Sequence, residues 1–315
     1  MRLAFVALCA ALIVFQGPIA QASTIVEYPL PTPPNGPHAI AQGPDGNLWF
    51  TERDANAIGR ISTSGRVKEF AIPTANSFPR DIALGPDGNL WFTEYNTNKI
   101  GRITTGGQIT EFKATTVASG PYAITGGPDG KVWFTEYDGN NVASITPTGT
   151  ITEYPLKRQR ADPSGIALGP DGNLWVTEFN PAKIIKVTTS GVQTGTDLPD
   201  QNSGPARITA GPDGNLWFTE LLSDKIGRIA TDGTGVAEFA LAPNVSPWGI
   251  TAGPDGNVWF TEYFGDVIGR ITPTGTITEL PTPTQFSHPN EICQGPNGKL
   301  WFTESGVEQI GKLTP

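Results

Sequence analysis

The stretch Gly43–Glu52, "GPDGNLWFTE", recurs with small changes along the whole of this 315-residue chain. Its tryptophan stands at positions 49, 91, 133, 175, 217, 259 and 301, so each copy lies 42 residues after the one before. A period of roughly 40–45 residues with several short strands in each unit is typical of β-propeller blades. The repeat therefore predicts an all-β fold, a seven-bladed β-propeller with four-stranded blades.

Each unit divides into four expected strands. The first begins at a Pro-x-x-Ile sequence, and a "GPDGN" turn follows it, because Pro fixes one φ angle while Asp and Gly tolerate the next positions. "LWFTE" is the second strand, and its apolar run suits a sheet covered on both faces. "KIGRIT" is the third strand, and "ITEF" or "ITEYP" is the fourth.

The two ends of the repeat predict how the ring closes. The last unit stops at Ile310–Pro315 and lacks a fourth strand, whereas Thr24–Pro31 resembles Thr150–Leu156, which lies in the fourth strand of an earlier unit. We expect the N-terminal segment to supply the outer strand of the last blade, because an unpaired edge would leave the ring open. The alternative is an open solenoid, but the terminal caps that a solenoid needs are missing.

Residues 1–22 have the pattern of a signal peptide, and residues 23–315 are expected to form one propeller domain. Arg2 precedes an apolar run, and small residues at Ala20–Ala22 form a cleavage site. We therefore expect an exported protein, periplasmic or extracellular, with an uncleaved anchor as the alternative. No other segment is apolar enough to span a membrane, and Cys293 is the one thiol that remains after cleavage.

The composition argues against one class of partner. The chain has 38 Gly and 29 Pro, carries a net charge of −9 and shows no basic run, so we expect no binding to nucleic acid. We expect a monomer whose partner is a small molecule, a peptide or a protein. A structural repeat module that assembles through its edges is a further alternative.

Comparison between the units separates scaffold from candidate site. The tryptophans, the Thr-Glu pairs and the Arg of "IGRI" recur, so we assign them to the blades. A ring of seven Glu as an acidic or metal site is the alternative, but catalysis needs one or two special carboxylates. No zinc-ligand spacing and no Gly-x-Ser-x-Gly occurs, so we predict no metal site and no nucleophilic serine.

The two residues between Pro and Ile change in every unit, and we expect them at one mouth of the central channel, beside the loops that follow "TE". A ligand-binding rim is the prediction, with a solvated loop rim as the alternative. The candidate ligand-binding residues are His38, Arg80, Asp81, Tyr122, Arg207, Trp248, Asn290 and Glu291, to which the loops add Tyr95, Tyr137, Phe179, Tyr263 and Phe264. Trp248 is outside the tryptophan repeat, so it is the candidate anchor.

His38 and His288 are the two histidines, and ring closure makes their blades neighbours. Together with Glu291 they are candidates for a catalytic group that abstracts a proton or holds a metal. Two ordinary surface histidines are the alternative.

The unit at 85–112, "GPDGNLWFTEYNTNKIGRITTGGQITEF", and its copies resemble the streptogramin B lyases, also called virginiamycin B lyases, over essentially the whole mature chain. The resemblance implies a seven-bladed propeller that opens a cyclic depsipeptide antibiotic at its ester by elimination. It also implies help from Mg²⁺ and a histidine that removes a proton next to a carbonyl. The unit differs from WD40 repeats, whose Gly-His and Trp-Asp marks are missing.

This chain departs from the family pattern at the site. The resemblance places the family's histidines at Pro-His-x-Ile of the last two blades, where this chain has Trp248 and Asn290. The resemblance places Ser305 in register with the family's catalytic glutamate. It also places His288 at the position of a second family acid, just before the Pro-x-x-Ile sequence of the last blade. We therefore predict a lyase-like binding protein without lyase activity. The alternative is an active Mg²⁺-dependent carbon-oxygen lyase whose site is rearranged around His38 and His288.

Overall fold

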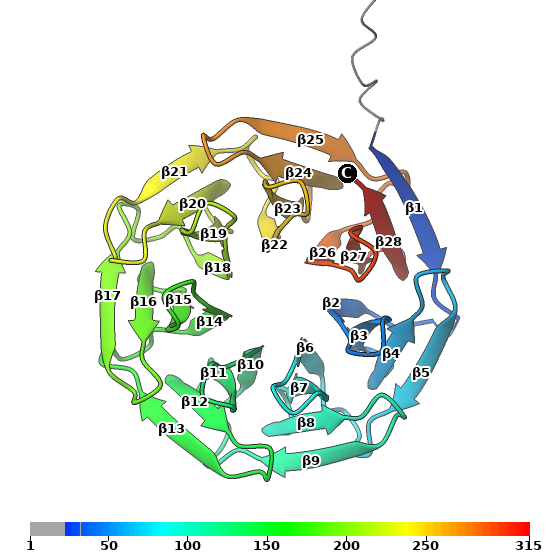
Figure 1. Cartoon of the computed structure of the whole chain (residues 1–315), viewed down its shortest axis with the longest axis horizontal. Coiled ribbons are helices and arrows are strands. Elements are labelled where there is room, and N and C mark those ends of the chain that lie inside the picture. The colour runs from blue at the N-terminus through cyan, green and yellow to red at the C-terminus, as the bar shows by residue number, and fades with distance from the viewer. Residues whose placement is uncertain (1–22, 32) are drawn as a thin grey trace, which may run out of the picture.

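Seven antiparallel sheets of four strands each stand around a central channel, as Figure 1 shows. The computed structural model describes residues 23–31 and 33–315, so the predicted signal peptide at 1–22 lies outside the described residues. Within the described ranges, no helix is long and apolar enough to cross a membrane. The prediction of an all-β, seven-bladed propeller is confirmed.

In every blade the four strands pair in order from the channel outward. The innermost strands are β2 (Pro37–Gln42), β6 (Pro79–Leu84), β10 (Pro121–Gly126), β14 (Pro163–Leu168), β18 (Pro205–Ala210), β22 (Pro247–Ala252) and β26 (Pro289–Gln294). The second strands are β3 (Leu48–Glu52), β7 (Leu90–Glu94), β11 (Val132–Glu136), β15 (Leu174–Glu178), β19 (Leu216–Glu220), β23 (Val258–Glu262) and β27 (Leu300–Glu304). The third strands are β4 (Ala57–Ile61), β8 (Lys99–Ile103), β12 (Asn141–Ile145), β16 (Lys183–Val187), β20 (Lys225–Ile229), β24 (Val267–Ile271) and β28 (Gln309–Thr314). The outer strands are β5 (Val67–Ala71), β9 (Ile109–Lys113), β13 (Ile151–Pro155), β17 (Gln193–Asp197), β21 (Ala237–Ala240), β25 (Ile277–Pro281) and β1 (Thr24–Pro29).

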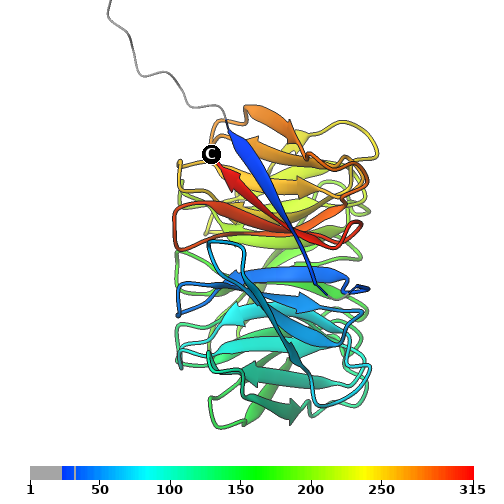
Figure 2. The same ribbon diagram turned by 90° about the vertical axis from the view of Figure 1, so that its right-hand side faces the viewer.

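The N-terminal strand β1 closes the ring. It pairs antiparallel with β28 from Thr24↔Thr314 to Pro29↔Gln309, and Figure 2 shows the two strands side by side. The last blade thus combines both ends of the described chain, and its outer edge is paired in the same way as in the other blades. This pairing confirms the predicted closure. Without β1, the outer edge of the last blade would expose unpaired backbone groups.

The repeated tryptophan forms the core between neighbouring blades. Trp49 is fully buried, and its Nε1 donates to Asp45 Oδ1 of the preceding turn at 3.0 Å. Phe70 on the outer strand stacks on it with centroids 5.5 Å apart, and the Arg60 guanidinium lies over the Trp49 ring. A Cβ added at Gly107 of the next blade would collide with the Phe70 ring, so the glycine leaves room for it. These contacts explain why Asp, Trp, Arg and Gly recur together.

Blade four departs from this arrangement. In five blades an aromatic ring of the outer strand stacks on the tryptophan or packs under the next glycine turn, and those rings belong to Tyr28, Phe70, Phe112, Tyr154 and Phe239. Leu280 stands at this position in blade six. In blade four it is Thr196, and a cavity of about 120 Å³ lies between Trp175, Thr196 and Gly233.

The Thr-Glu pair ties each blade to the next. Thr303 Oγ1 accepts from the Glu291 backbone N–H at 3.1 Å and donates to the His38 carbonyl across the closure at 2.8 Å. The same pair of bonds recurs around the ring, so seven threonine hydroxyls link the innermost strands. The neighbouring glutamates are buried, in agreement with a structural role for these recurring residues.

Candidate functional site

The changing pair of each innermost strand, the two residues between its Pro and Ile, places its two side chains at different depths along the channel. A bulge lies between Pro and Ile in all seven strands, so the two side chains do not follow a regular alternation. The first residues of several pairs, His38, Arg80, Trp248 and Asn290, line a pocket at the channel mouth. The second residues Asp81, Arg207 and Glu291 lie in the channel itself. The predicted rim is therefore two sites, one above the other.

In the channel, Arg207 lies between two carboxylates from distant blades. Its Nε is 2.7 Å from Glu291 Oε2, and its Nη1 is 3.5 Å from Asp81 Oδ2. Burial alone would lower the pKa of Arg207, but Glu291 and Asp81 raise it above its ordinary value. Burial raises the pKa of Glu291 to about 7 despite the opposing effect of Arg207. Two of the predicted site residues, Asp81 and Glu291, thus compensate the charge of the third, Arg207, inside the ring.

The mouth pocket is a cavity of about 360 Å³ with one apolar side. It is lined by His38, Arg53, Arg80, Leu221, Leu222, Ser246, Trp248, Tyr263, Phe264 and Asn290. Two of its apolar side chains are well exposed, Leu222 at 62% and Phe264 at 64%. Such a concave, mostly apolar surface with a few convergent polar groups is the usual form of a small-molecule site.

His38 is buried and neutral. Its Nδ1 lies 2.8 Å from the Arg80 carbonyl, and since a carbonyl only accepts, Nδ1 carries the proton and Nε2 keeps its lone pair. Its ring meets the edge of Trp248 at 6.2 Å. Burial holds the pKa of His38 well below 6.5, and the charges of Arg80, Arg207 and Arg53 lower it further. A proton on Nε2 is therefore strongly disfavoured.

Trp248 and Asn290 each keep a buried polar atom without a hydrogen-bond partner within the described residues, Nε1 of Trp248 and Oδ1 of Asn290. Asn290 is 5% exposed, while Trp248 is half-buried. The Arg207 guanidinium lies 5.6 Å from the Trp248 ring and supports it from the channel side. Unpaired buried polar atoms typically cost about 1–3 kcal/mol each, so a ligand that pairs them would gain from doing so.

Arg80 belongs to an aromatic cluster beside the pocket. Its guanidinium lies 3.9 Å from the Tyr122 ring centroid and donates to the Tyr122 hydroxyl. Tyr95 and Tyr137 pack on Tyr122 at 6.2 and 5.0 Å. Tyr95 and Tyr137, two of the predicted loop aromatics, thus pack against Tyr122, the first residue of its changing pair.

His288 does not join a catalytic group with Glu291. The His288 ring stacks on Tyr263 at 4.8 Å and meets Phe264 at 5.8 Å, whereas Glu291 pairs with Arg207. Across residues 23–31 and 33–315, no three His, Cys, Asp or Glu side chains gather as metal ligands. Of the expected group of His38, His288 and Glu291, Glu291 thus pairs with Arg207 in the channel, while the His288 ring packs against the loop after β23; a catalytic role for His38 or His288 stays a prediction.

Sequence comparison alone missed four pocket residues, Arg53, Leu221, Leu222 and Ser246. Arg53 and Leu221 directly follow the Thr-Glu pair of their blades, at the position where other blades have Tyr95 or Tyr137, and Leu222 is the next residue. Two adjacent leucines in a loop of otherwise polar repeats were the available signal, because exposed apolar loop residues often mark a contact surface.

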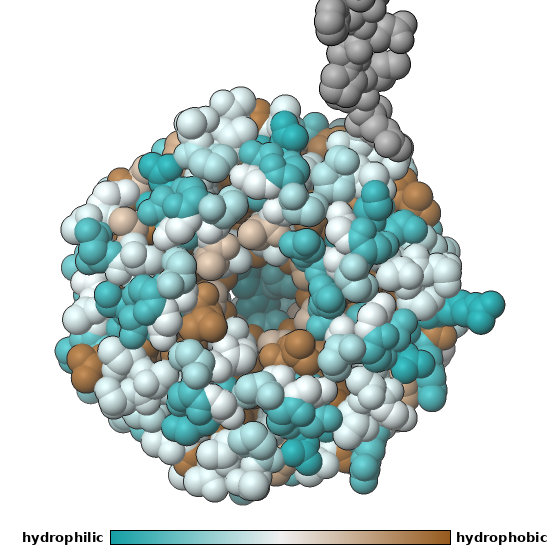
Figure 3. All heavy atoms as spheres, viewed as in Figure 1, coloured by the Kyte–Doolittle hydropathy of each residue, from teal (hydrophilic) through white to brown (hydrophobic). Residues whose placement is uncertain are grey.

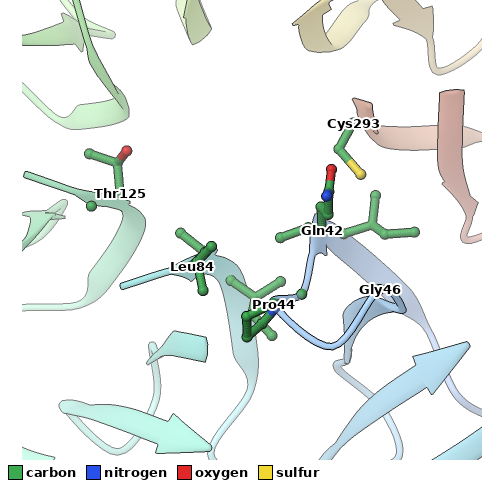
Figure 4. A pocket seen from close by; sticks show the side chains of 12 residues that line it. Gln42, Pro44, Gly46, Leu84, Thr125 and Cys293 are labelled. Atoms are coloured by element: carbon green, nitrogen blue, oxygen red, sulfur yellow. The ribbon is translucent and has the colours of Figure 1, made fainter. Parts of the chain in front are cut away.

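The opposite mouth of the channel has a different lining. A cavity of about 650 Å³ opens there between Gln42, Leu84, Thr125 and Cys293, as Figure 4 shows. In Figure 3 hydrophobic atoms border the opening over the ends of β6 and β14, and hydrophilic atoms lie deep inside it. Burial raises the pKa of the Cys293 thiol, which makes it a poor nucleophile.

The family model of virginiamycin B lyases matches residues 15–178 and 153–315, which together span the propeller. The chain belongs to the virginiamycin B lyase family. A solved streptogramin B lyase is 39% identical, with 93% of this chain and 97% of that one covered and a TM-score of 0.89. The virginiamycin B lyase of Staphylococcus aureus is 40% identical over 93% of this chain and all of that one, at the same TM-score. A catalytically inactive histidine-to-alanine variant of it, solved with quinupristin, gives the same values.

The mouth pocket differs from the pattern that the family resemblance implies at two positions. Trp248 and Asn290 occupy the two positions for which the family resemblance implies histidines, and both line the pocket. Mg²⁺ prefers carboxylate and water oxygens in octahedral geometry. The pocket lining offers two arginines and no carboxylate, so its residues do not fit this ion.

Proposed function

We propose that this member of the family binds a small molecule or a peptide with a large apolar group at the mouth pocket and does not catalyse ring opening. The observation that carries the proposal is the pocket of about 360 Å³ walled by Leu221, Leu222, Trp248, Tyr263 and Phe264. Bulky apolar walls at a channel mouth favour binding, while a general base with a suitable pKa is what elimination requires.

The polar groups near the pocket support binding without catalysis. Trp248 has no basic atom, and an Asn290 amide does not take up a proton near neutral pH. His38 has a strongly lowered pKa beside three arginines, so it would resist becoming a cation. Loss of a general base typically lowers a rate about 10²–10⁴-fold.

A second function has one observation in its favour. The hydrogen bond from His38 Nδ1 to the Arg80 carbonyl leaves Nε2 as the free acceptor, which is the tautomer that a general base needs. An active carbon-oxygen lyase with His38 as its base is therefore the rival proposal. This version leaves His288 and Glu291 out of the chemistry.

One experiment separates the two functions. The purified protein is mixed with quinupristin with and without Mg²⁺, and ring opening is followed by mass spectrometry while binding is followed by calorimetry. We expect binding without turnover, and we expect Trp248→Ala to weaken it at least about tenfold. Leu84→Ala, at the opposite mouth, is the matched control and should bind like the wild type. Turnover that His38→Ala abolishes would establish the rival.

We also propose that the protein is exported and monomeric, on the basis of the pattern in residues 1–22 and the paired outer edge of the last blade. N-terminal sequencing of the protein secreted by an expressing cell tests export, with Ser23 as the expected first residue. Light scattering at micromolar concentration tests the monomer.

A further inference from the structure

The mouth pocket combines its apolar walls with an excess of positive charge. Arg53 and Arg80 line it, and the set of lining residues contains no Asp or Glu. Arg53 has an exposed partner in Asp54, with its Nε 3.2 Å from Asp54 Oδ1. Exposed pairs of this kind contribute little, so the pocket retains much of the charge of Arg53.

Arg80 has no carboxylate partner among the described residues. Its guanidinium contacts the ring and the hydroxyl of Tyr122, and its Nε is buried without a hydrogen-bond partner. Arg207 in the channel differs, because Asp81 and Glu291 neutralise it. Burial lowers the pKa of Arg80, and the nearby Arg207 and Arg53 also act in that direction although Tyr122 opposes them. A half-buried guanidinium without a carboxylate partner, at a pocket wall, favours an anion, above all a carboxylate.

Two neutral groups add a hydrogen-bond pattern to this charge. Asn290 Oδ1 is a buried acceptor without a partner, and Trp248 Nε1 is a buried donor without one, again within the described part of the chain. An acylated amine would satisfy both, because its N–H can donate to Asn290 and its carbonyl can accept from Trp248. The apolar walls then take a side chain next to that amide.

We propose that the ligand of this pocket is a carboxylate with an adjacent amide and an apolar or aromatic side chain, the chemistry of an N-acylated apolar amino acid. The inference rests on the proposed binding function and specifies its ligand class. The carboxylate lies against Arg80 and Arg53, the amide meets Asn290 and Trp248, and the side chain packs on Tyr263 and Phe264. A free N-acylated amino acid and the C-terminus of a peptide carry the same groups, so both are sources of this ligand.

The test compares matched ligands by calorimetry at low and high salt. N-acetyl-L-phenylalanine carries the carboxylate, and N-acetyl-L-phenylalaninamide lacks only its charge. We expect the acid to bind about tenfold to a hundredfold more tightly, the range for hydrogen bonds to charged groups. The preference should shrink at high salt, because the charge of Arg53 is partly exposed. N-acetylglycine, without the side chain, should bind at least about tenfold more weakly than the acid.

A second pair of ligands distinguishes the source of the carboxylate. A tripeptide ending in phenylalanine is compared with its C-terminal amide. Equal affinity of the tripeptide acid and N-acetyl-L-phenylalanine indicates that a peptide terminus fits, whereas binding of the free amino acid derivative alone indicates a small-molecule ligand. Either result supports the carboxylate class.

Two variants assign the preference to its residues. Arg80→Gln and Arg53→Gln should each reduce the acid-to-amide ratio, and Arg66→Gln, at a turn on the opposite face, should leave it unchanged. Thermal unfolding checks that the variants are folded, and Arg53→Gln decides the test if Arg80→Gln does not fold. Equal binding of acid and amide by the wild type overturns the carboxylate class but leaves the site. If neither these ligands nor quinupristin binds, the proposed function fails as well.

Discussion

Replacing Glu94 with glutamine should stabilise the protein above pH 7 and leave it nearly unchanged at pH 5. Glu94 is fully buried, and its Oε2 accepts from Thr97 at 3.0 Å. Burial raises its pKa from 4.5 to about 8, and the neighbouring charge of Glu111 adds to the rise. The folded protein therefore holds this proton more tightly than the unfolded chain does. The stability that this proton contributes is complete below pH 4.5 and is lost as the pH rises toward 8.

The pKa shift sets the size of the effect. One pKa unit corresponds to about 1.4 kcal/mol, so a shift from 4.5 to about 8 gives at most about 5 kcal/mol. A glutamine in this place accepts from Thr97 and donates toward Glu111 as the protonated glutamate does, and it has no proton to lose. We expect Glu94→Gln to raise the free energy of unfolding by about 2–5 kcal/mol at pH 8.5.

Urea unfolding followed by tryptophan fluorescence at pH 5, 7 and 8.5 measures this gain. Asp87→Asn is the matched control, for which we expect a change in the free energy of unfolding of the opposite sign. Burial raises the pKa of Asp87, but hydrogen bonds from Trp91 and Asn89 outweigh it and hold the pKa below 3.8. This contribution is present above pH 3.8 and is lost as the pH falls through the lowered pKa, so Asp87→Asn should destabilise the protein more at pH 7 than in acid. A Glu94→Gln variant that is equally affected at pH 5 and 8.5 would refute the reasoning.

Three further substitutions follow from the packing. Thr196→Phe should fill the cavity of blade four and raise the free energy of unfolding by about 1–2 kcal/mol, seen as a higher melting temperature; a lower one would contradict the account. Tyr28→Ala should cost about 2 kcal/mol by removing the ring that the N-terminal strand stacks in the last blade, and chemical denaturation that shows no loss would argue against a closing role for that strand. Arg207→Leu should cost about 3–5 kcal/mol at pH 8, because Asp81 and Glu291 lose their partner, and less at pH 5, which lies below the raised pKa of Glu291 of about 7; a pH-independent loss would mean that pairing is not the cause.

The scaffold could be predicted because the same sequence motif is repeated in every blade. One Trp spacing of 42 residues and one Asp-Gly turn would be weak signals, but seven copies in phase specify the ring and the closure by β1. The bond from Thr51 to the Arg80 carbonyl could not be predicted, because it joins residues 29 positions apart in different blades. Repetition indicates that a residue is structural without indicating what it contacts.

The candidate site was predictable in position but not in arrangement. The changing pairs do lie at the channel, yet the bulge sends His38 and Trp248 to the mouth pocket and Arg207 into the channel. Contacts across the ring depend on the geometry of the blades. The sequence alone therefore does not indicate that Glu291 contacts Arg207 and not His288. Leu221 was not predicted because a leucine in a loop has no titratable or hydrogen-bonding group that would mark it as a site residue.

The bridge from Asp81 through Arg207 to Glu291 joins β6, β18 and β26, which belong to three different blades, across the channel. The threonine bonds link only adjacent blades, whereas this bridge ties distant ones together at the centre of the ring. A substitution at any one of these three residues therefore alters the environment of two other blades.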